Sequence, residues 1–564
     1  MSAVLTDNLP LLADAPNGIK KLRELILELA VRGKLVPQDP SDEPASELLK
    51  RIAEEKARLV AQGKIKKQKP LAGVEEAALP FKLPEAWVWA RLGEITNFGT
   101  TTKKDEIPDD AWVLDLEDIE KDTSRLLQKA RFYERNSLSD KNSFAKGDVL
   151  YGKLRPYLNK ILVAEDDGFC TTEILPFRCH GPFVAHYFMV ALKSPYFLSY
   201  VNAKSYGMKM PRLGTEDGRQ ALFPLPPLAE QHRIVAKVDE LMALCDRLEA
   251  RQADADSAHF QLVQALLGSL TQASDAEDFA QSWQRLSKQF HTLFTTDSSI
   301  DALKQTLLQL AVMGKLLPQD SRDEPASELL KRVSEEKARL VAEGKLKKQK
   351  PLGDIAISDI PFDVPDNWAW SRIGEISLNT EYGLSEKTFD LQDGVPVLKM
   401  GDIQEGRVLL GGQMAVSKNT EGLPGLFLET EDLLYNRTNS AELVGKTGVF
   451  LGQAGEYSFA SYLIRIRCLK ELFSPLYLNI SMNAPGFRET QINPHLKQQC
   501  GQANVNGTIM KNMLVSVPPL PEQHRIVAKV DQLMALCEQL KTRLNQALQV
   551  HEHLANALVE QAVA

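Results

Sequence analysis

The segment that decides the fold is EQHRIVAKVDELMALC at residues 230–245, because it returns as EQHRIVAKVDQLMALC at residues 522–537 with one mismatch in 16 positions. A longer block behaves in the same way: residues 28–71 return as residues 309–352, with 35 of 44 positions identical. The chain therefore contains one scaffold twice. Two copies so far apart are too few, and their period is too long, for a solenoid.

The repeated blocks carry helical periodicity. Apolar residues recur at alternating steps of four and three over residues 234–266 and 526–558, which predicts two long coiled-coil helices. Shorter helices are predicted to begin near Ile19 and Ile300 and to cover residues 44–61 and 325–342. Because apolar seams need partners, we expect the long helices to pack antiparallel, which would give a pseudo-twofold object made from one chain.

Composition sets the class of protein. The 564 residues are 43% hydrophobic and 25% charged, which is typical of a globular chain of several domains. The net charge of -8 excludes a polycation held on nucleic acid by bulk charge, so any DNA contact must come from local basic patches. No apolar run approaches the ~20 residues of a membrane span, and six cysteines form no CxxC pair, so we expect a cytoplasmic protein with no membrane contact.

Two inserts of different length, residues 96–229 and 377–521, separate the scaffold blocks. Faint matches align them, such as GDVLYGK at residues 147–153 with EDLLYNR at residues 431–437. Their short apolar runs predict strands, so each insert is predicted to be a compact α/β domain of the same fold. The predicted fold class is α+β, with two α/β domains joined by long antiparallel coiled-coil helices in a pseudo-twofold internal repeat.

The ends of the repeats give the predicted domain limits. The scaffold is expected at 1–84 (N-terminal helices), 230–365 (a central helical spacer) and 522–564 (a C-terminal helix), and the α/β domains at 85–229 and 366–521.

In each insert a strand ending in Leu-Tyr runs into a basic loop, GKLRPYLNK after Tyr151 and NRTNSAELVGKT after Tyr435. Arg, Lys and Asn side chains have the donor geometry that suits guanine and adenine edges in the major groove. The two tyrosines are expected to pack in the core rather than to stack on bases. For each basic residue the alternative is an ordinary surface charge or a bond to the domain's own loop. The predicted DNA contacts are Lys153, Arg155, Lys160, Lys209, Arg212, Arg437, Asn439, Lys446 and Lys511.

The sequence contains no complete catalytic motif. Gly445-Lys446-Thr447 looks like the end of a P-loop, but Ser440 occupies the place of the first glycine and the strand-loop-helix setting is missing. The inserts share no cluster of His, Cys or carboxylate residues. We therefore expect no catalytic residue, no cofactor-binding residue and no metal site. Two alternatives to a DNA reader stay open: a helical adaptor that binds proteins, and an enzyme with an unrecognised site.

Each of the two variable domains ends in a PPL-x-EQHRIV segment that starts a long helix, at residues 226–235 and 518–527. In this arrangement the chain resembles, over nearly its whole length, the specificity subunit of Type I restriction-modification enzymes. The resemblance implies that each insert is a target recognition domain reading one half of an asymmetric, bipartite site in double-stranded DNA. It implies that the helices set the spacing and dock two modification (methyltransferase) subunits, which recruit restriction subunits. The chain itself would then be non-catalytic, directing N6-adenine methylation and restriction, with S-adenosylmethionine, ATP and magnesium belonging to the partners.

The repeat supports this interpretation independently. Near-identical scaffolds present the same surface twice, which suits two copies of one partner, whereas unlike inserts suit a target with two unlike halves. The basic runs KIKKQK at residues 64–69 and KLKKQK at residues 345–350 could touch phosphates or a partner, or could be solvated helix ends. Exposed seams and docking surfaces predict poor solubility of the chain without its partners.

Overall fold

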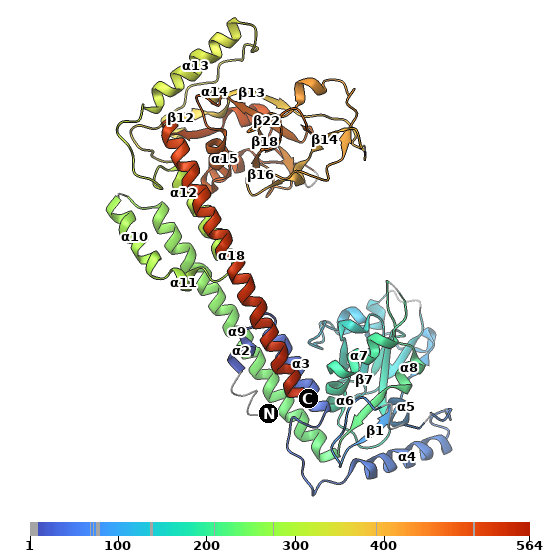
Figure 1. Cartoon of the computed structure of the whole chain (residues 1–564). Helices are drawn as coiled ribbons and strands as arrows, with labels where there is room; N and C mark the ends of the chain where they lie inside the picture. The colour runs from blue at the N-terminus through green and yellow to red at the C-terminus, as the bar shows by residue number, and fades with distance from the viewer. Residues whose placement is uncertain are drawn as a thin grey trace. The chain divides into compact units, whose positions relative to one another are not determined.

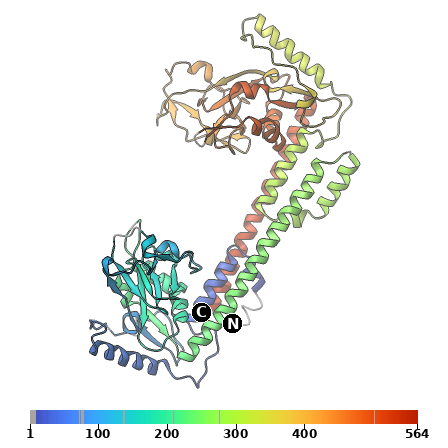
Figure 2. The ribbon, with the colours of Figure 1, turned by 180° about the vertical axis from the view of Figure 1, so that it is seen from behind.

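A computed structural model of the chain describes residues 9–67, 69–71, 73–74, 79–135, 139–207, 209–274, 276–390, 392–499 and 502–563. Its internal contacts form two units: unit 1 is Met1–Ala255 with Ala547–Ala564, and unit 2 is Asp256–Gln546. Both units combine helices with small sheets (Figures 1 and 2), so the predicted α+β class is confirmed. The boundaries between the units fall inside two long helices and do not test the predicted domain limits.

In its described residues, unit 1 has sheets of strand order β1-β11, β2-β10-β7-β8 and β3-β6-β9-β4-β5. Its strands are β1 (Val88–Arg91), β2 (Thr96–Asn97), β3 (Thr100–Thr102), β4 (Trp112–Leu114), β5 (Ala130–Arg131), β6 (Lys141–Phe144), β7 (Val149–Gly152), β8 (Ile161–Val163), β9 (Gly168–Thr171), β10 (Ile174–Cys179) and β11 (Leu222–Leu225). Its helices are α2 (Leu9–Ala13), α3 (Gly18–Val31), α4 (Ala45–Ala61), α5 (Leu92–Ile95), α6 (Ala185–Lys193), α7 (Pro195–Lys204), α8 (Thr215–Gln220) and the first part of α9 (Leu228–Thr271). Short 3-10 turns are η2 (Lys104–Glu106), η3 (Leu116–Asp118), η4 (Phe132–Glu134) and η5 (Pro156–Leu158).

Unit 2 holds sheets of strand order β12-β25, β13-β22-β18-β20-β16-β15, β17-β14-β21 and β19-β24-β23. Its strands are β12 (Ala369–Arg372), β13 (Ser377–Tyr382), β14 (Val395–Leu398), β15 (Ile403–Gln404), β16 (Arg407–Val408), β17 (Ala415–Val416), β18 (Leu433–Asn436), β19 (Thr438–Asn439), β20 (Thr447–Val449), β21 (Ser458–Phe459), β22 (Leu463–Cys468), β23 (Lys497–Gln499), β24 (Gln502–Asn504) and β25 (Leu514–Val517). Its helices are α10 (Ala276–Lys288), α11 (Phe290–Leu293), α12 (Asp297–Val312), α13 (Ala326–Ala342), α14 (Ile373–Ile376), α15 (Pro475–Asn483), α16 (Pro485–Phe487), α17 (Gly507–Asn512) and most of α18 (Leu520–Val563). The short turns are η6 (Ile357–Asp359), η7 (Met400–Asp402), η8 (Leu423–Leu426), the π-helical η9 (Arg488–Ile492) and η10 (Asn493–His495).

The two inserts share a core arrangement of strands. In unit 1 the order β2-β10-β7-β8 puts the strand that ends in Leu-Tyr beside β10, and in unit 2 the order β13-β22-β18-β20 puts its counterpart beside β22. All of these neighbours pair antiparallel. The strands predicted from the faint matches between the inserts are therefore confirmed.

The repeated glutamate of the EQHR segment is buried in both units. Glu230 and Glu522 are each 1% exposed. Glu230 accepts hydrogen bonds from Trp87 Nε1 at 2.9 Å and from Gln38 Nε2 at 2.6 Å, and Glu522 accepts one from Trp368 Nε1 at 3.0 Å. Burial raises the pKa of both carboxyl groups. The repeated Glu and Trp residues thus form one buried contact in each scaffold copy.

The glutamine that follows has an equivalent role. Gln231 Oε1 accepts the backbone N–H of Val184 at 3.0 Å, and Gln523 Oε1 accepts that of Ser474 at 2.9 Å. Each glutamine also donates to the carbonyl of the proline five residues before it. These bonds fix the start of each long helix against its insert, so burial explains why the Glu-Gln pair of the segment is repeated.

The coiled-coil seam is less regular than the sequence predicts. The seam residues of α9 from Ile234 to Cys245 are buried, but Leu262 and Leu554 are each 48% exposed, while Val263 and Ala555, one position later, are buried. The predicted seam is wrong at these positions. A helix of 3.6 residues per turn drifts by about 20° per heptad from a strict seven-residue repeat, so the buried stripe passes to the next residue.

Within the described residues no helix is both long and apolar enough to cross a membrane.

Helices α4 and α13 share one burial pattern. Their buried side chains lie in the first half of each helix: Ala45, Leu48 and Ile52 in α4, and Ala326, Leu329 and Val333 in α13. The second half of each helix lies at the edge of its unit, as Figures 1 and 2 show. Both predicted helices are confirmed within one residue of their expected starts.

Candidate nucleic-acid interface

The basic loops follow the two strands that end in Leu-Tyr, and the tyrosines anchor these strands in the core. Tyr151 is 2% exposed and Tyr435 is fully buried, and burial raises the pKa of both phenols. Tyr151 packs on Phe177 and Phe197 with ring centroids 5.9 Å away in each case. The prediction that the two tyrosines serve core packing is confirmed.

An aspartate at the start of each strand locks the turn that precedes it. Asp148 Oδ2 accepts the backbone N–H of Ala145, and Asp432 Oδ2 accepts that of Glu429, each at 2.8 Å. An arginine from the neighbouring strand then binds the same carboxylate: Arg178 through Nη2 at 2.8 Å and Arg467 through Nη2 at 2.6 Å. The faint Asp-x-Leu-Tyr match is therefore a structural motif that fixes where each loop begins.

In unit 1 two loops distant in sequence are tied together by their backbones; we call residues 153–160 and the described part of 205–213 loop pair 1. Arg155 N donates to Pro211 O at 2.7 Å, and Leu213 N donates to Lys153 O at 3.0 Å. Arg155 adopts a left-handed backbone conformation with φ 50°. The structure thus brings together the predicted residues on both loops.

The basic side chains of loop pair 1 differ in whether they already bond to other groups of the protein. Arg155 and Lys209 are exposed, and within the described residues neither side chain has an ion pair or hydrogen bond. Arg212 binds Glu173 at 3.0 Å, Lys160 Nζ donates to the carbonyl of Leu116 at 2.8 Å, and Lys153 is half-buried. Arg155 and Lys209 are therefore the side chains freest to meet a ligand.

Sequence reasoning missed the apolar members of this surface. Tyr157, Tyr206 and Met210 are 46%, 62% and 52% exposed, on the same two loops as the basic residues. Aromatic and apolar groups beside arginine and lysine are suited to thymine methyl groups and base faces. The signal in the sequence was Tyr and Met placed in glycine- and proline-containing turns, where no core position is expected.

In unit 2 the equivalent surface is loop pair 2, residues 437–447 and the described part of 497–505. Val505 N donates to Arg437 O at 2.9 Å, in the same way as the Leu213 to Lys153 bond of unit 1. The Arg437 guanidinium lies 5.0 Å above the ring of Tyr382, and Asn439 Oδ1 accepts the backbone N–H of Ser440 at 2.8 Å. Lys446 is exposed. The scaffold of the surface is shared with unit 1, whereas its side chains differ.

Comparison with known proteins covers both units. A family model of the Type I restriction modification DNA specificity domain matches residues 365–550. The Type I restriction enzyme EcoEI specificity subunit of Escherichia coli is 38% identical over 565 residues, which is 97% of this chain and 94% of that protein. The EcoAI specificity subunit of the same organism is 38% identical over 566 residues, with the same coverage. The chain belongs to the Type I restriction enzyme specificity subunits.

The fold of this specificity subunit also resembles a solved structure. A chain from a study of complex assembly and conformational transition of the type I R-M system has a TM-score of 0.53 at 18% identity, covering 86% of this chain and 99% of that one. At this identity the likeness concerns the fold alone.

The remaining predicted contact, Lys511, lies on α17, outside the two segments of loop pair 2. It packs against Gly374 of α14 and stands near Lys337, whose pKa is lowered first by burial and further by Lys511. Arg219 of α8 has the same relation to Lys56 in unit 1. Lys511 therefore belongs to the junction of insert and scaffold.

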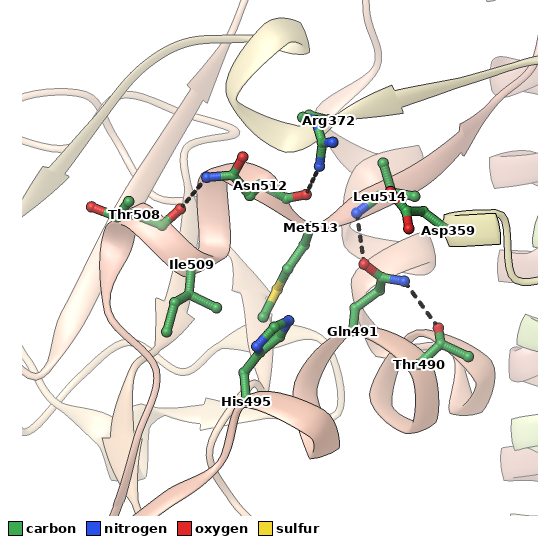
Figure 3. Close-up of a pocket in the computed structure, with 10 residues that line it drawn as sticks. All are labelled: Asp359, Arg372, Thr490, Gln491, His495, Thr508, Ile509, Asn512, Met513 and Leu514. Atoms are coloured by element: carbon green, nitrogen blue, oxygen red, sulfur yellow. Dashed lines mark hydrogen bonds between the residues drawn. The ribbon is translucent and has the colours of Figure 1, made fainter. Parts of the chain in front are cut away.

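A cavity of about 440 Å³ in unit 2 is lined by both polar and apolar residues (Figure 3). Its arginine, Arg372, donates to the carbonyls of Asn512 at 2.7 Å and Gly353 at 2.8 Å. Gln491 accepts the N–H of Leu514 and donates to Thr490. These polar groups serve the protein's own structure. No group of three metal-ligating side chains occurs in the part of the chain that the structure describes. The cavity lining is Asp359, Arg372, Thr490, Gln491, His495, Thr508, Ile509, Asn512, Met513 and Leu514.

Proposed function

We propose that this specificity subunit reads an asymmetric, bipartite sequence in double-stranded DNA, one half through each loop pair. The observation that carries the proposal is that two equivalent backbone frames present unlike side chains: Arg155 and Lys209 in unit 1, and Arg437, Asn439 and Lys446 in unit 2. Equivalent frames place donors at the same depth, while different donors select different bases.

The other predicted residues take supporting roles in this proposal. Arg212 and Lys153 add positive potential to loop pair 1, and Lys160, which binds the carbonyl of Leu116, holds the loop in position. The exposed Tyr206 and Met210 supply apolar contact to thymine methyl groups. A bidentate hydrogen-bonded pair between a side chain and a base is worth about 1–3 kcal/mol of discrimination against the wrong base.

The scaffold has a second task in the proposal. The helices α9 and α18 pack antiparallel as a pseudo-twofold spacer that sets the distance between half-sites, and the domain limits are those predicted from the repeat. The exposed His232 and His524, equivalent positions in the two EQHR copies, support docking of two identical modification subunits, because burial does not account for their repetition. The complex would then recruit restriction subunits in the cytoplasm. N6-adenine methylation and cleavage, with S-adenosylmethionine, ATP and magnesium, would be the work of those partners.

The test uses the chain in complex with its modification subunits, acting on a random-sequence DNA library whose methylated adenines are sequenced. Wild-type complex should methylate one bipartite sequence. The change of Arg155 and Lys209 to Ala should relax one half of it, and the change of Arg437 and Asn439 to Ala should relax the other half. A matched control removes two exposed charges of α9, Arg247→Ala with Arg251→Ala, and should leave both halves intact.

Methylation that depends on no sequence in the wild-type complex would support the alternative of a helical protein-protein adaptor and overturn the proposal. Relaxation of both halves by each double variant would also contradict it, because the loop pairs would not act as separate readers.

A further inference from the structure

Each unit carries a second basic segment that the loop pairs do not use. We name residues 56–69 arm 1 and residues 337–350 arm 2. Arm 1 contains six basic and no acidic residues, and arm 2 contains six basic residues and one acidic residue, in a chain of net charge -8. Each arm begins in the second half of α4 or α13 and continues past a glycine with positive φ, Gly63 or Gly344. Positive charge is thus concentrated at two equivalent places.

The lysines at the ends of the arms are exposed and, within the described residues, have neither an ion pair nor a side-chain hydrogen bond. Like charges held close together repel one another, and a bound polyanion would relieve that repulsion. Lys345 differs because it pairs with Glu343 at 2.9 Å. The six lysines in question are Lys66, Lys67, Lys69, Lys347, Lys348 and Lys350.

The base of each arm lies beside the element that follows a loop pair. Lys56 Nζ donates to Gly93 O at 2.6 Å and is close to Arg219 of α8, the helix that begins directly after loop pair 1. In unit 2, Lys337 Nζ donates to Gly374 O at 2.9 Å and is close to Lys511 of α17. Basic groups therefore continue from each loop pair, through α8 or α17, to the arm.

The arms are the last part of the repeated scaffold block, and the likeness between the two copies falls off shortly after them. They are identical at 12 of 14 positions, and the Pro-Leu pair that follows is also repeated, whereas residues 72–79 share no position with 353–360. Exposed positions usually tolerate substitution with little effect on stability, so folding does not explain this identity. The two halves of the proposed target differ in their bases but have the same sugar-phosphate backbone. Identical arms therefore match the backbone, as unlike loops match the bases.

We propose that arms 1 and 2 bind the phosphate backbone of the duplex beside each half-site and extend the contact beyond the loop pairs. This inference rests on the proposed DNA-reading function. Lysine suits the task because its ammonium is a point charge on a flexible stem, which needs no fixed donor geometry. The arms supply affinity without sequence preference.

The experiment measures DNA binding by the complex of the full chain with its modification subunits between about 50 and 200 mM salt. Variants change Lys66, Lys67 and Lys69 to Gln in arm 1, the three equivalent lysines in arm 2, or all six. The slope of log affinity against log salt should fall by about 0.9 for each phosphate that a variant no longer neutralises, so by up to about 3 for one arm. Target and non-target duplexes should weaken by the same factor. Lys→Arg changes at the same positions keep the charge and should keep the slope.

A slope that changes by less than about 0.5 in the six-lysine variant would overturn the proposal. So would dissociation of a modification subunit from the complex with an unchanged slope, which would make the arms protein-docking segments. Failure of the proposed function looks different: the wild-type complex would then bind target and non-target duplexes equally, whatever the arms do.

Discussion

Asp148 and Asp432 stand at equivalent places before the two Leu-Tyr strands, so the same substitution can be compared in the two units of one molecule. We predict that Asp432→Ala destabilises unit 2 much more than Asp148→Ala destabilises unit 1. Both carboxylates accept a backbone N–H at 2.8 Å and bind an arginine of the adjacent strand. The difference lies in that arginine, since Arg467 is 16% exposed and Arg178 is 51% exposed.

The expected losses of stability follow from the exposure of the two arginines. Removing one partner of a buried ion pair costs about 3–5 kcal/mol, because the remaining charge is left without compensation. Arg467 keeps a contact with Glu429 at 2.8 Å, so we expect about 3 kcal/mol for Asp432→Ala. Arg178 is rehydrated when its partner is removed, and solvent already screens it. The cost there is about 1–2 kcal/mol, mostly the backbone hydrogen bond.

Amide hydrogen exchange of the full chain in its complex measures these energies strand by strand. Exchange in β18 and β22 should accelerate by about 100-fold in Asp432→Ala, and exchange in β7 and β10 by about 10-fold in Asp148→Ala, at about 1.4 kcal/mol per factor of ten. Adding Arg467→Met to Asp432→Ala removes the orphan charge and should recover part of the stability. Equal acceleration in the two units would refute the reasoning from arginine exposure.

Two further predictions concern the scaffold. Gly33→Ala and Gly314→Ala should each lower the free energy of unfolding by about 2–3 kcal/mol in urea titrations, since φ is +69° and +70° and a Cβ would lie 2.4 and 2.5 Å from a proline Cγ. Gly63→Ala, at φ +68° with open space around it, is the matched control and should cost only about 1 kcal/mol; an equal cost at all three sites would contradict the clash. The second prediction concerns pH: burial raises the pKa of Glu230 and Glu522 above 4.5, so the folded chain keeps protons that the unfolded chain releases. Relative to the Glu230→Gln, Glu522→Gln double variant, the wild type should therefore lose stability as pH rises from about 4.5 through the raised pKa, and parallel pH profiles of the two proteins would speak against it.

The helices and the order of the chain could be predicted from the sequence because their signals are local or repeated. Apolar spacing marks α4 and α13 within one residue of their starts, and the EQHR copies mark the beginnings of α9 and α18. The strand ending in Tyr151 and its counterpart ending in Tyr435 follow from short apolar runs bounded by polar turns. The same repeated motifs were enough to indicate the family.

The candidate site could be predicted only in part. The loops after the two strands are where the sequence placed them, and Arg155 and Arg437 are in them. The sequence could not distinguish Lys160, which bonds to the carbonyl of Leu116, from Lys209, which is exposed. Both are lysines in polar loops, and the partner of Lys160 lies 44 residues away along the chain.

What the sequence by itself determined is the periodic part of this protein: two copies of a helical scaffold, two α/β inserts and a basic loop at an equivalent place in each. Only the tertiary structure decided which side chains share a surface, because the hydrogen bonds that join Arg155 to Pro211 and Arg437 to Val505 link segments more than fifty residues apart. Periodicity is set by the geometry of one helix or strand. Whether a charged side chain is bonded within the protein or free to bind a ligand depends instead on the groups that folding brings beside it.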